Sequence, residues 1–153
     1  MYEVVKVKNA VTPTKITFFM TVIENKIAIA DYCVRSYAKI RGIPFSLAIY
    51  PNYISERSKK KYVSRWRRFN FVEILEDESQ QSLYPHWLVL DRQLRKIKTP
   101  FVATVDYDFE ILGPKFIKDM LSKLDENDNL VAMSTNFYSA HWSSPKVPVN
   151  SVS

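Results

Sequence analysis

The chain has 153 residues, of which 46% are hydrophobic and 14% aromatic, and this composition supports one domain with a buried core. Its two glycines fit neither a P-loop nor a dinucleotide-binding motif, and its single cysteine, Cys33, excludes a disulfide framework and a thiolate metal site. The sequence shows no membrane-length apolar run and no leader-like start, which predicts a cytoplasmic protein, and its net charge of +6 favours anionic partners.

The first part of the chain alternates between strand-like and helix-like segments. Residues 1–11 contain valines among charges and predict either a short edge strand or a loosely held arm. Apolar, β-branched runs predict strands at residues 15–23 and 45–50. Residues 26–40, between them, have the spacing of a helix, and Cys33 is expected to be a small core residue of that helix.

A strongly basic helix is predicted at residues 54–69. Its lysines and arginines, in the segment Arg57–Arg68, surround an aromatic face that includes Trp66. The favoured interpretation is a solvated outer face whose aromatic residues pack on a sheet. The alternatives are contact with an acidic membrane surface or with a nucleic acid.

The rest of the chain continues the alternation. The sequence predicts strands at 71–75, 101–105 and 130–133, and helices at 85–97 and 114–124. The apolar face of the first of these helices is expected to consist of Trp87, Leu90, Leu94 and Ile97.

This order of elements predicts an α/β fold, with a mostly parallel sheet, right-handed crossovers and helices on both faces. We expect one domain over residues 1–137. Residues 138–153 are rich in Ser and Pro and predict a loop or tail, or the start of a further region.

The strand at 101–105 ends in two aspartates, Asp106 and Asp108. Ligands bind at the carboxyl ends of strands in open α/β sheets, and alternation would turn both carboxylates to one point while Tyr107 points away. Two hard oxygen ligands suit Mg²⁺ or Mn²⁺, which leave other positions to phosphates and water. We therefore expect a divalent cation that binds a diphosphate here; the alternative is a solvated loop without function.

Residues Ile97–Phe109, with the sequence IKTPFVATVDYDF, resemble the strand and Asp-x-Asp motif of glycosyltransferases with the GT-A fold. The resemblance extends over residues 15–137 and implies a Rossmann-like sheet that binds a nucleoside-diphosphate sugar and transfers the sugar to an acceptor hydroxyl. It implies that Asp108 ligates Mn²⁺ or Mg²⁺ directly, and that Asp106 ligates the metal or reaches the ribose.

The same resemblance assigns further residues to the nucleotide and sugar site. Thr21 and Glu24, at the end of the first central strand, would line the nucleotide, and Tyr107 would lie beside it. The helix that carries Asp91 and Arg92 would line the sugar pocket, with Arg92 at a phosphate or at the sugar.

The chain departs from the family pattern in two places. Many relatives end the second strand in an acidic residue, whereas this chain has Tyr50-Pro51-Asn52, so Tyr50 is expected to stack on the base and Asn52 to hydrogen-bond it. The acceptor-binding half, which carries the general base of inverting members, would begin after about residue 137. We expect His141 to complete the metal shell and a partner chain or oligomer to complete the site.

Two other functions remain open from the sequence. A nucleotidyltransferase-like enzyme would need the same carboxylates, together with a Gly- and Arg-rich loop for a triphosphate. A non-catalytic module would bind nucleic acid or an acidic membrane through Arg57–Arg68.

Overall fold

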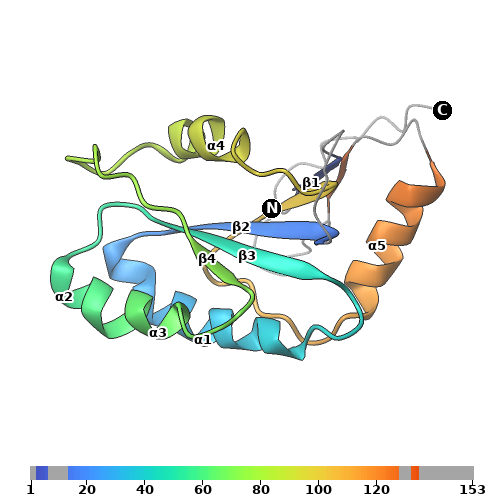
Figure 1. Ribbon diagram of the computed structural model, residues 1–153, viewed down its shortest axis with the longest axis horizontal. Helices are drawn as coiled ribbons and strands as arrows, with labels where there is room; N and C mark the ends of the chain where they lie inside the picture. Colours follow the sequence, from blue (N-terminus) through green and yellow to red (C-terminus); the bar gives the residue numbers. More distant parts are fainter. Residues whose placement is uncertain (1–2, 7–13, 128–131, 135–153) are drawn as a thin grey trace, which may run out of the picture.

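Strand β2 (Ile16–Val22) lies at the centre of a six-stranded sheet in the computed structural model, which describes residues 3–6, 14–127 and 132–134 (Figure 1). The other strands are β1 (Glu3–Lys6), β3 (Phe45–Pro51), β4 (Val72–Ile74), β5 (Phe101–Val105) and β6 (Ala132–Ser134). Their order across the sheet is β4-β3-β2-β5-β1-β6.

Strands β4, β3, β2 and β5 are all parallel. Ile16, at the start of β2, pairs with Phe45 of β3 on one side and with Phe101 of β5 on the other. The central strands consist mainly of buried apolar residues, as is typical of a parallel sheet that is covered on both faces. The predicted α/β fold with a mostly parallel sheet is confirmed.

The N-terminal strand β1 runs antiparallel to both of its neighbours. Glu3 lies opposite Thr104 of β5 and opposite Ser134 of β6. The sequence indicated an edge strand or a loose arm, and both expectations were wrong, because β6 pairs on the far side of β1. A short valine-rich pattern shows strand propensity but cannot show which distant strands will pair with it.

Helices cover both faces of the sheet, as expected (Figure 1). Phe18 and Phe19 of β2 point to opposite faces and belong to two separate hydrophobic cores. The larger core is covered by α1 (Ile27–Ser36), by the helical segment Glu56–Trp66 and by α5 (Lys115–Glu126); the smaller core is covered by α4 (His86–Leu94). None of the helices in the described ranges is long and apolar enough to cross a membrane.

The helical segment Glu56–Trp66 consists of α2 (Glu56–Ser58), a π-helical turn (Lys59–Val63) and α3 (Ser64–Trp66). It is shorter than the predicted helix at 54–69. The Ser55 side chain accepts a hydrogen bond from the Ser58 N–H (3.2 Å) and so caps the start of the segment. The π-helical turn places one more residue in the middle of the helix than an α-helix would, which a regular 3.6-residue pattern does not reveal.

The predicted apolar face of α4 is confirmed for Leu90, Leu94 and Ile97, which pack in the smaller core, but not for Trp87. Val89 and Gln93, one turn apart, are buried, whereas Trp87 is 68% exposed. Leu90 and Leu94 are half-buried beside them. Trp87 precedes Val89 by two residues, which is about 200° around the helix, so its side chain lies away from the buried side.

A buried carboxylate joins α1 to α3. Asp31 is 4% exposed and accepts hydrogen bonds from Trp66 Nε1 (3.0 Å) and Arg65 Nη1 (3.0 Å). Arg35 Nη2 lies 3.3 Å from the same carboxylate. These contacts hold two helices side by side on one face of the sheet and keep the buried indole N–H paired.

We expect Asp31→Ala to lower the free energy of unfolding by about 2 kcal/mol, because it leaves the Trp66 N–H buried without an acceptor. Urea denaturation measures this change. Asp119→Ala removes the exposed partner of Lys115 on α5 and serves as the control, with a loss of less than about 0.5 kcal/mol. Equal losses in the two variants would contradict a structural role for Asp31.

Candidate functional site

The carboxyl ends of β4, β3, β2 and β5 form one edge of the sheet, which we call the carboxyl edge. Because β2 is in register with β3 and β5, the residues that follow these strands meet there. Neighbouring strands lie about 4.8 Å apart, so the ends of β3 and β5 are separated by roughly 10 Å. The carboxyl edge carries most of the site residues that the sequence predicts.

Asp106 and Asp108 follow β5 directly, and both are exposed. Regular strand alternation ends at Val105, and residues Asp106–Phe109 form a turn that the Phe109 N–H closes on the Asp106 carbonyl (3.1 Å). The aspartates are therefore presented by a turn, rather than by the strand alternation that we expected. Tyr107 is half-buried and packs against the larger core.

Lys26 adds positive charge beside the turn, and the carboxylates of the turn act on Cys33. Lys26 Nζ lies 5.8 Å from the centre of the Tyr107 ring and brings a cation to the same end of the sheet. Burial, together with the negative charges of Asp108 and Glu110, raises the pKa of the Cys33 thiol. Cys33 is therefore an unreactive core residue, as expected.

Asp108 is not tied to another side chain, unlike Glu110 and Glu76. Within the described ranges it has no hydrogen bond and no ion pair. Glu110 is paired with Lys39 (3.2 Å), and Glu76 forms an ion pair with Arg67. The carboxylate of Asp108 is thus available for a cation from solution.

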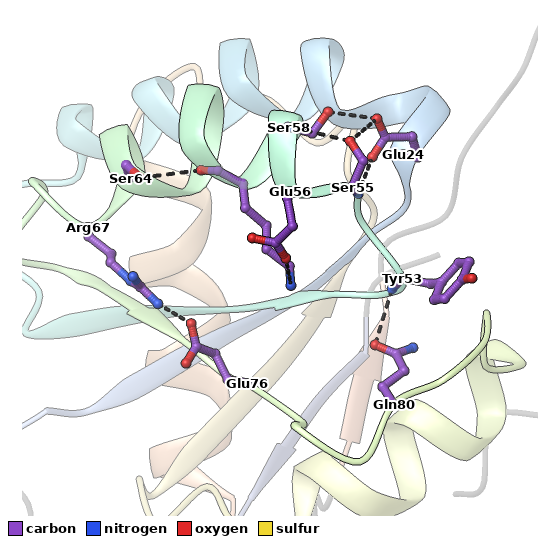
Figure 2. Close-up of polar contacts among 10 residues, drawn as sticks. Glu24, Tyr53, Ser55, Glu56, Ser58, Ser64, Arg67, Glu76 and Gln80 are labelled. Carbon is purple, nitrogen blue, oxygen red and sulfur yellow. Dashed lines mark hydrogen bonds and ion pairs between the residues drawn. The ribbon is translucent and has the colours of Figure 1, made fainter.

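Glu24 joins the end of β2 to the start of α2 (Figure 2). Its carboxylate accepts hydrogen bonds from the Ser58 hydroxyl (2.6 Å), the Ser55 hydroxyl (2.9 Å) and the Ser55 N–H (2.9 Å). The hydrogen bonds from the Ser58 hydroxyl and from the Ser55 N–H are the main causes that keep the pKa of Glu24 below its usual value. The structure therefore gives Glu24 a positioning role.

Asn52 is buried and fastens the loop before α4 to the end of β3. Its Nδ2 donates to the Tyr84 carbonyl (2.8 Å), and its Oδ1 accepts from the Tyr84 N–H (3.0 Å) and from Gln80 Nε2 (2.5 Å). The sequence assigned the Asn52 side chain to the nucleotide base. In the structure these three bonds occupy it, so Asn52 holds the loop of Gln80 and Tyr84 in place.

Tyr50 lies beneath this loop and is 1% exposed. Burial, reinforced by the Asp77 carboxylate, raises the pKa of the Tyr50 hydroxyl to about 12. Among the described residues, the buried Thr21 hydroxyl has no hydrogen-bond partner. The Tyr50 ring is part of the core under α4, so it has no face open to a base and the expected stacking does not fit this conformation.

Arg92 reaches the carboxyl edge from α4. Its guanidinium lies 4.9 Å from the centre of the Tyr84 ring and 3.8 Å from Asp77 Oδ2, and its side chain is 46% exposed. Asp77 also accepts hydrogen bonds from the hydroxyl (2.5 Å) and N–H (3.1 Å) of Ser79, which lead in lowering its pKa. Asp91, the other predicted residue of α4, is paired with Arg95 (2.7 Å).

Tyr53, which the sequence analysis missed, is the aromatic residue presented at the end of β3. Its φ of 57° lies in the left-handed region, which is uncommon for a residue other than glycine. Its N–H donates to Gln80 Oε1 (3.1 Å), and its side chain is 56% exposed and points away from the sheet (Figure 2). Such backbone strain is held by surrounding contacts and is common at functional sites.

A groove of about 890 Å³ lies next to Tyr53. The helical segment Glu56–Trp66 forms one wall, residues 75–80 form the other, and Glu24 lies at one end. The Arg67–Glu76 ion pair links the two walls (Figure 2). The carboxyl edge therefore combines a groove, an exposed aromatic ring and, at β5, an available carboxylate.

The described residues contain no cluster of three His, Cys, Asp or Glu side chains that would hold a metal alone. Asp106 and Asp108 by themselves suit a cation that takes its remaining ligands from phosphates and water. His141, predicted as a further ligand, lies outside the described residues.

Solved structures with a similar fold include two that were determined in complex with a nucleotide sugar. Residues 1–349 of S. aureus TarS match with a TM-score of 0.57 and 18% identity, over 74% of this chain and 33% of that chain. The same protein in complex with UDP-GlcNAc matches equally well, over 74% of this chain and 32% of that one. The mannosyltransferase PcManGT from Pyrobaculum calidifontis, in complex with GDP-Man and Mn²⁺, matches with a TM-score of 0.56 and 11% identity, over 76% of this chain and 36% of that chain.

The chain has the GT-A glycosyltransferase fold. The resemblance based on Ile97–Phe109 is thereby confirmed at the level of the fold. The chain spans about a third of the length of these proteins. No family model and no curated protein matches it.

We expect the contribution of Glu24 to stability to depend on pH. Its pKa is lower in the folded chain than its ordinary value of 4.5, so its stabilisation is fully present above that value and is lost as the pH falls through the folded-state pKa. Glu24→Gln should therefore be less stable than the wild type at pH 7, and this difference should shrink in acid. Urea denaturation over a pH series measures it.

Glu73→Gln is a matched control, because Glu73 is exposed and makes no side-chain hydrogen bond or ion pair within residues 14–127. Its stability difference from the wild type should vary less with pH. A Glu24→Gln difference that stays constant down to acid pH would contradict the role of the Glu24 bonds.

Proposed function

We propose that this chain is the donor-binding part of a glycosyltransferase that uses a nucleoside-diphosphate sugar with Mn²⁺ or Mg²⁺. The observation that carries the proposal is the exposed Asp108, which lacks a partner among the described residues and follows a central strand of a GT-A sheet. The neighbours supply context, since TarS was solved with UDP-GlcNAc and PcManGT with GDP-Man and Mn²⁺.

The distance along the carboxyl edge and the side chains on it suit a nucleoside-diphosphate sugar. The nucleoside would lie at the end of β3, beside Tyr53 and the groove, and the diphosphate at the end of β5, roughly 10 Å away. Lys26, next to Tyr107, would add positive charge near the diphosphate. The exposed part of Arg92 would contact a phosphate or the sugar.

Asp106 and Asp108 would hold the cation on the diphosphate, with Asp108 as a direct ligand and Asp106 as a ligand or a contact of the ribose. A bound cation supplies Lewis-acid stabilisation of the negative charge on the departing nucleoside diphosphate. Glu24 and Asn52 would act indirectly, because their hydrogen bonds fix the walls between which the nucleoside lies. Thr21, near the end of β2, would line the nucleotide site from the sheet.

The acceptor side of the reaction is assigned to groups outside the described residues. A glycosyl transfer to a hydroxyl in an inverting enzyme needs a general base near the acceptor. We propose that a longer chain, a partner chain or an oligomer supplies this base and the acceptor surface, consistent with the third of its neighbours' length that this chain spans.

The decisive test is calorimetric titration of UDP and of GDP, each with and without Mn²⁺, into the wild type and Asp108→Asn. We expect metal-dependent binding of at least one nucleotide. Loss of a direct metal ligand should weaken that binding by about a hundredfold or more, while the nearly isosteric side chain leaves the fold intact.

Glu110→Gln is the matched control, because Glu110 lies two residues from Asp108 but is already paired with Lys39 and Tyr32. It should leave binding within a few-fold of the wild type. If the wild type binds neither nucleotide with Mn²⁺ or Mg²⁺, the proposed function is wrong. Metal-dependent binding that survives Asp108→Asn would remove Asp108 from the metal site.

A second prediction separates Tyr53 from the fold. Tyr53→Gly should weaken nucleotide binding about tenfold, since stacking of a base on an aromatic ring contributes about 1–3 kcal/mol. It should not lower the melting temperature, because glycine adopts a positive φ without strain. Tyr53→Phe, which keeps the ring, should bind as the wild type does; equal affinity of Tyr53→Gly and the wild type would exclude stacking.

A further inference from the structure

One side of the molecule carries the excess positive charge of the chain. Residues 27–41 and 56–69, which include α1 and the helical segment Glu56–Trp66, contain ten lysines and arginines but only two acidic residues. Both elements lie on the same side of the sheet (Figure 1). Since the net charge of the whole chain is +6, this side is more positive than the chain as a whole.

The contacts neutralise only part of this charge. Arg35 of α1 and Arg65 of α3 share a single carboxylate, that of Asp31. Arg57, Lys61 and Arg68 are exposed and have no acidic partner within the described ranges. Arg57, Lys61 and Arg65 recur every four positions along the helical segment, and Arg68 follows three residues later in the turn after it; we call these four residues the basic stripe.

Two exposed apolar side chains accompany the basic stripe. On α1, Ile29 is 46% exposed and Tyr32 is 56% exposed, one turn apart. Arg35 follows Tyr32 by three residues and meets Arg65 at Asp31, so the exposed side of α1 adjoins the basic stripe. The Tyr62 ring, half-buried, lies under Lys61 Nζ at 4.8 Å and under Arg65 at 5.7 Å.

We propose that the basic stripe and the exposed side of α1 form a docking surface for a membrane rich in acidic phospholipids. Clustered lysines and arginines are attracted to an anionic leaflet, and aliphatic and aromatic side chains among them bury apolar area at the headgroup boundary. This combination, on the outside of two adjacent helices, distinguishes a lipid surface from a nucleic acid. A nucleic acid would use the cations but would not favour an exposed isoleucine.

The inference is independent of the proposed function, because it uses none of the residues assigned to the nucleotide. It is compatible with that function, because the groove is lined by Lys59, Lys60 and Ser64 of the same helical segment and by no residue of the basic stripe.

The test is sedimentation of the full chain with vesicles of phosphatidylcholine alone and of phosphatidylcholine with phosphatidylserine. We expect binding only to the acidic vesicles, with an affinity that falls as salt is added. The variant Arg57→Gln/Lys61→Gln/Arg68→Gln should bind about a hundredfold more weakly, or about five-fold per cation removed. It keeps the Asp31 contacts, and circular dichroism verifies that it is folded.

The matched control is Lys115→Gln/Lys118→Gln/Lys123→Gln on α5, which removes the same net charge from another helix and should bind nearly as the wild type does. Ile29→Ser/Tyr32→Ser should weaken binding while leaving its salt dependence unchanged. Equal losses in the two triple variants, or equal binding to neutral vesicles, would overturn the proposal. Binding of a single-stranded oligonucleotide without binding of acidic vesicles would also overturn it and identify a nucleic-acid surface.

Discussion

The in-register parallel pairing of β2 with both β3 and β5 is the constraint on which the rest of the structure depends. Ile16 stands level with Phe45 and with Phe101, so the three strands run side by side towards one edge. The polar residues that follow each strand are thereby collected at one edge, although they are far apart in the sequence. A shift of one strand by a single residue would exchange its two faces and separate its end from those of its neighbours.

The polar groups at that edge divide into two kinds. The first kind forms hydrogen bonds to other parts of the protein and holds the loops around the groove in place; it comprises Glu24, Asn52 and Asp77. Asp108, in contrast, has none within the described part of the chain. A binding site needs both kinds, because a carboxylate that is free to hold a cation is useful only if the surrounding loops are held in place.

Much of the fold follows from local sequence pattern, and the site does so only in part. The parallel strands and the covering helices could be predicted because buried strands and amphipathic helices have distinct apolar periods. The same holds for Asp106 and Asp108, whose position after a buried strand is visible in the sequence. Each of these features depends on residues that are neighbours in the chain.

The features that the sequence did not reveal depend on contacts between distant residues. The interior place of β1 is set by β5 and β6, and the exposure of Trp87 is set by which side of α4 is buried, that of Val89 and Gln93. Tyr50 and Tyr53 are only three residues apart, yet one is buried and the other exposed. The difference arises from the left-handed turn at Tyr53, a conformation that the identity of the residue does not suggest.

The position of β1 has a consequence for the order in which the chain can fold. Residues 3–6 are synthesised long before their partner strand β5, which is completed only at residue 105, and before β6, which follows later still. The closing of such a long loop carries an entropic cost that must be met before these contacts form. The four parallel strands can therefore pair with one another before β1 pairs with β5. In the sheet, β6 pairs with β1, so the place of β6 depends on a strand that precedes it by more than 120 residues.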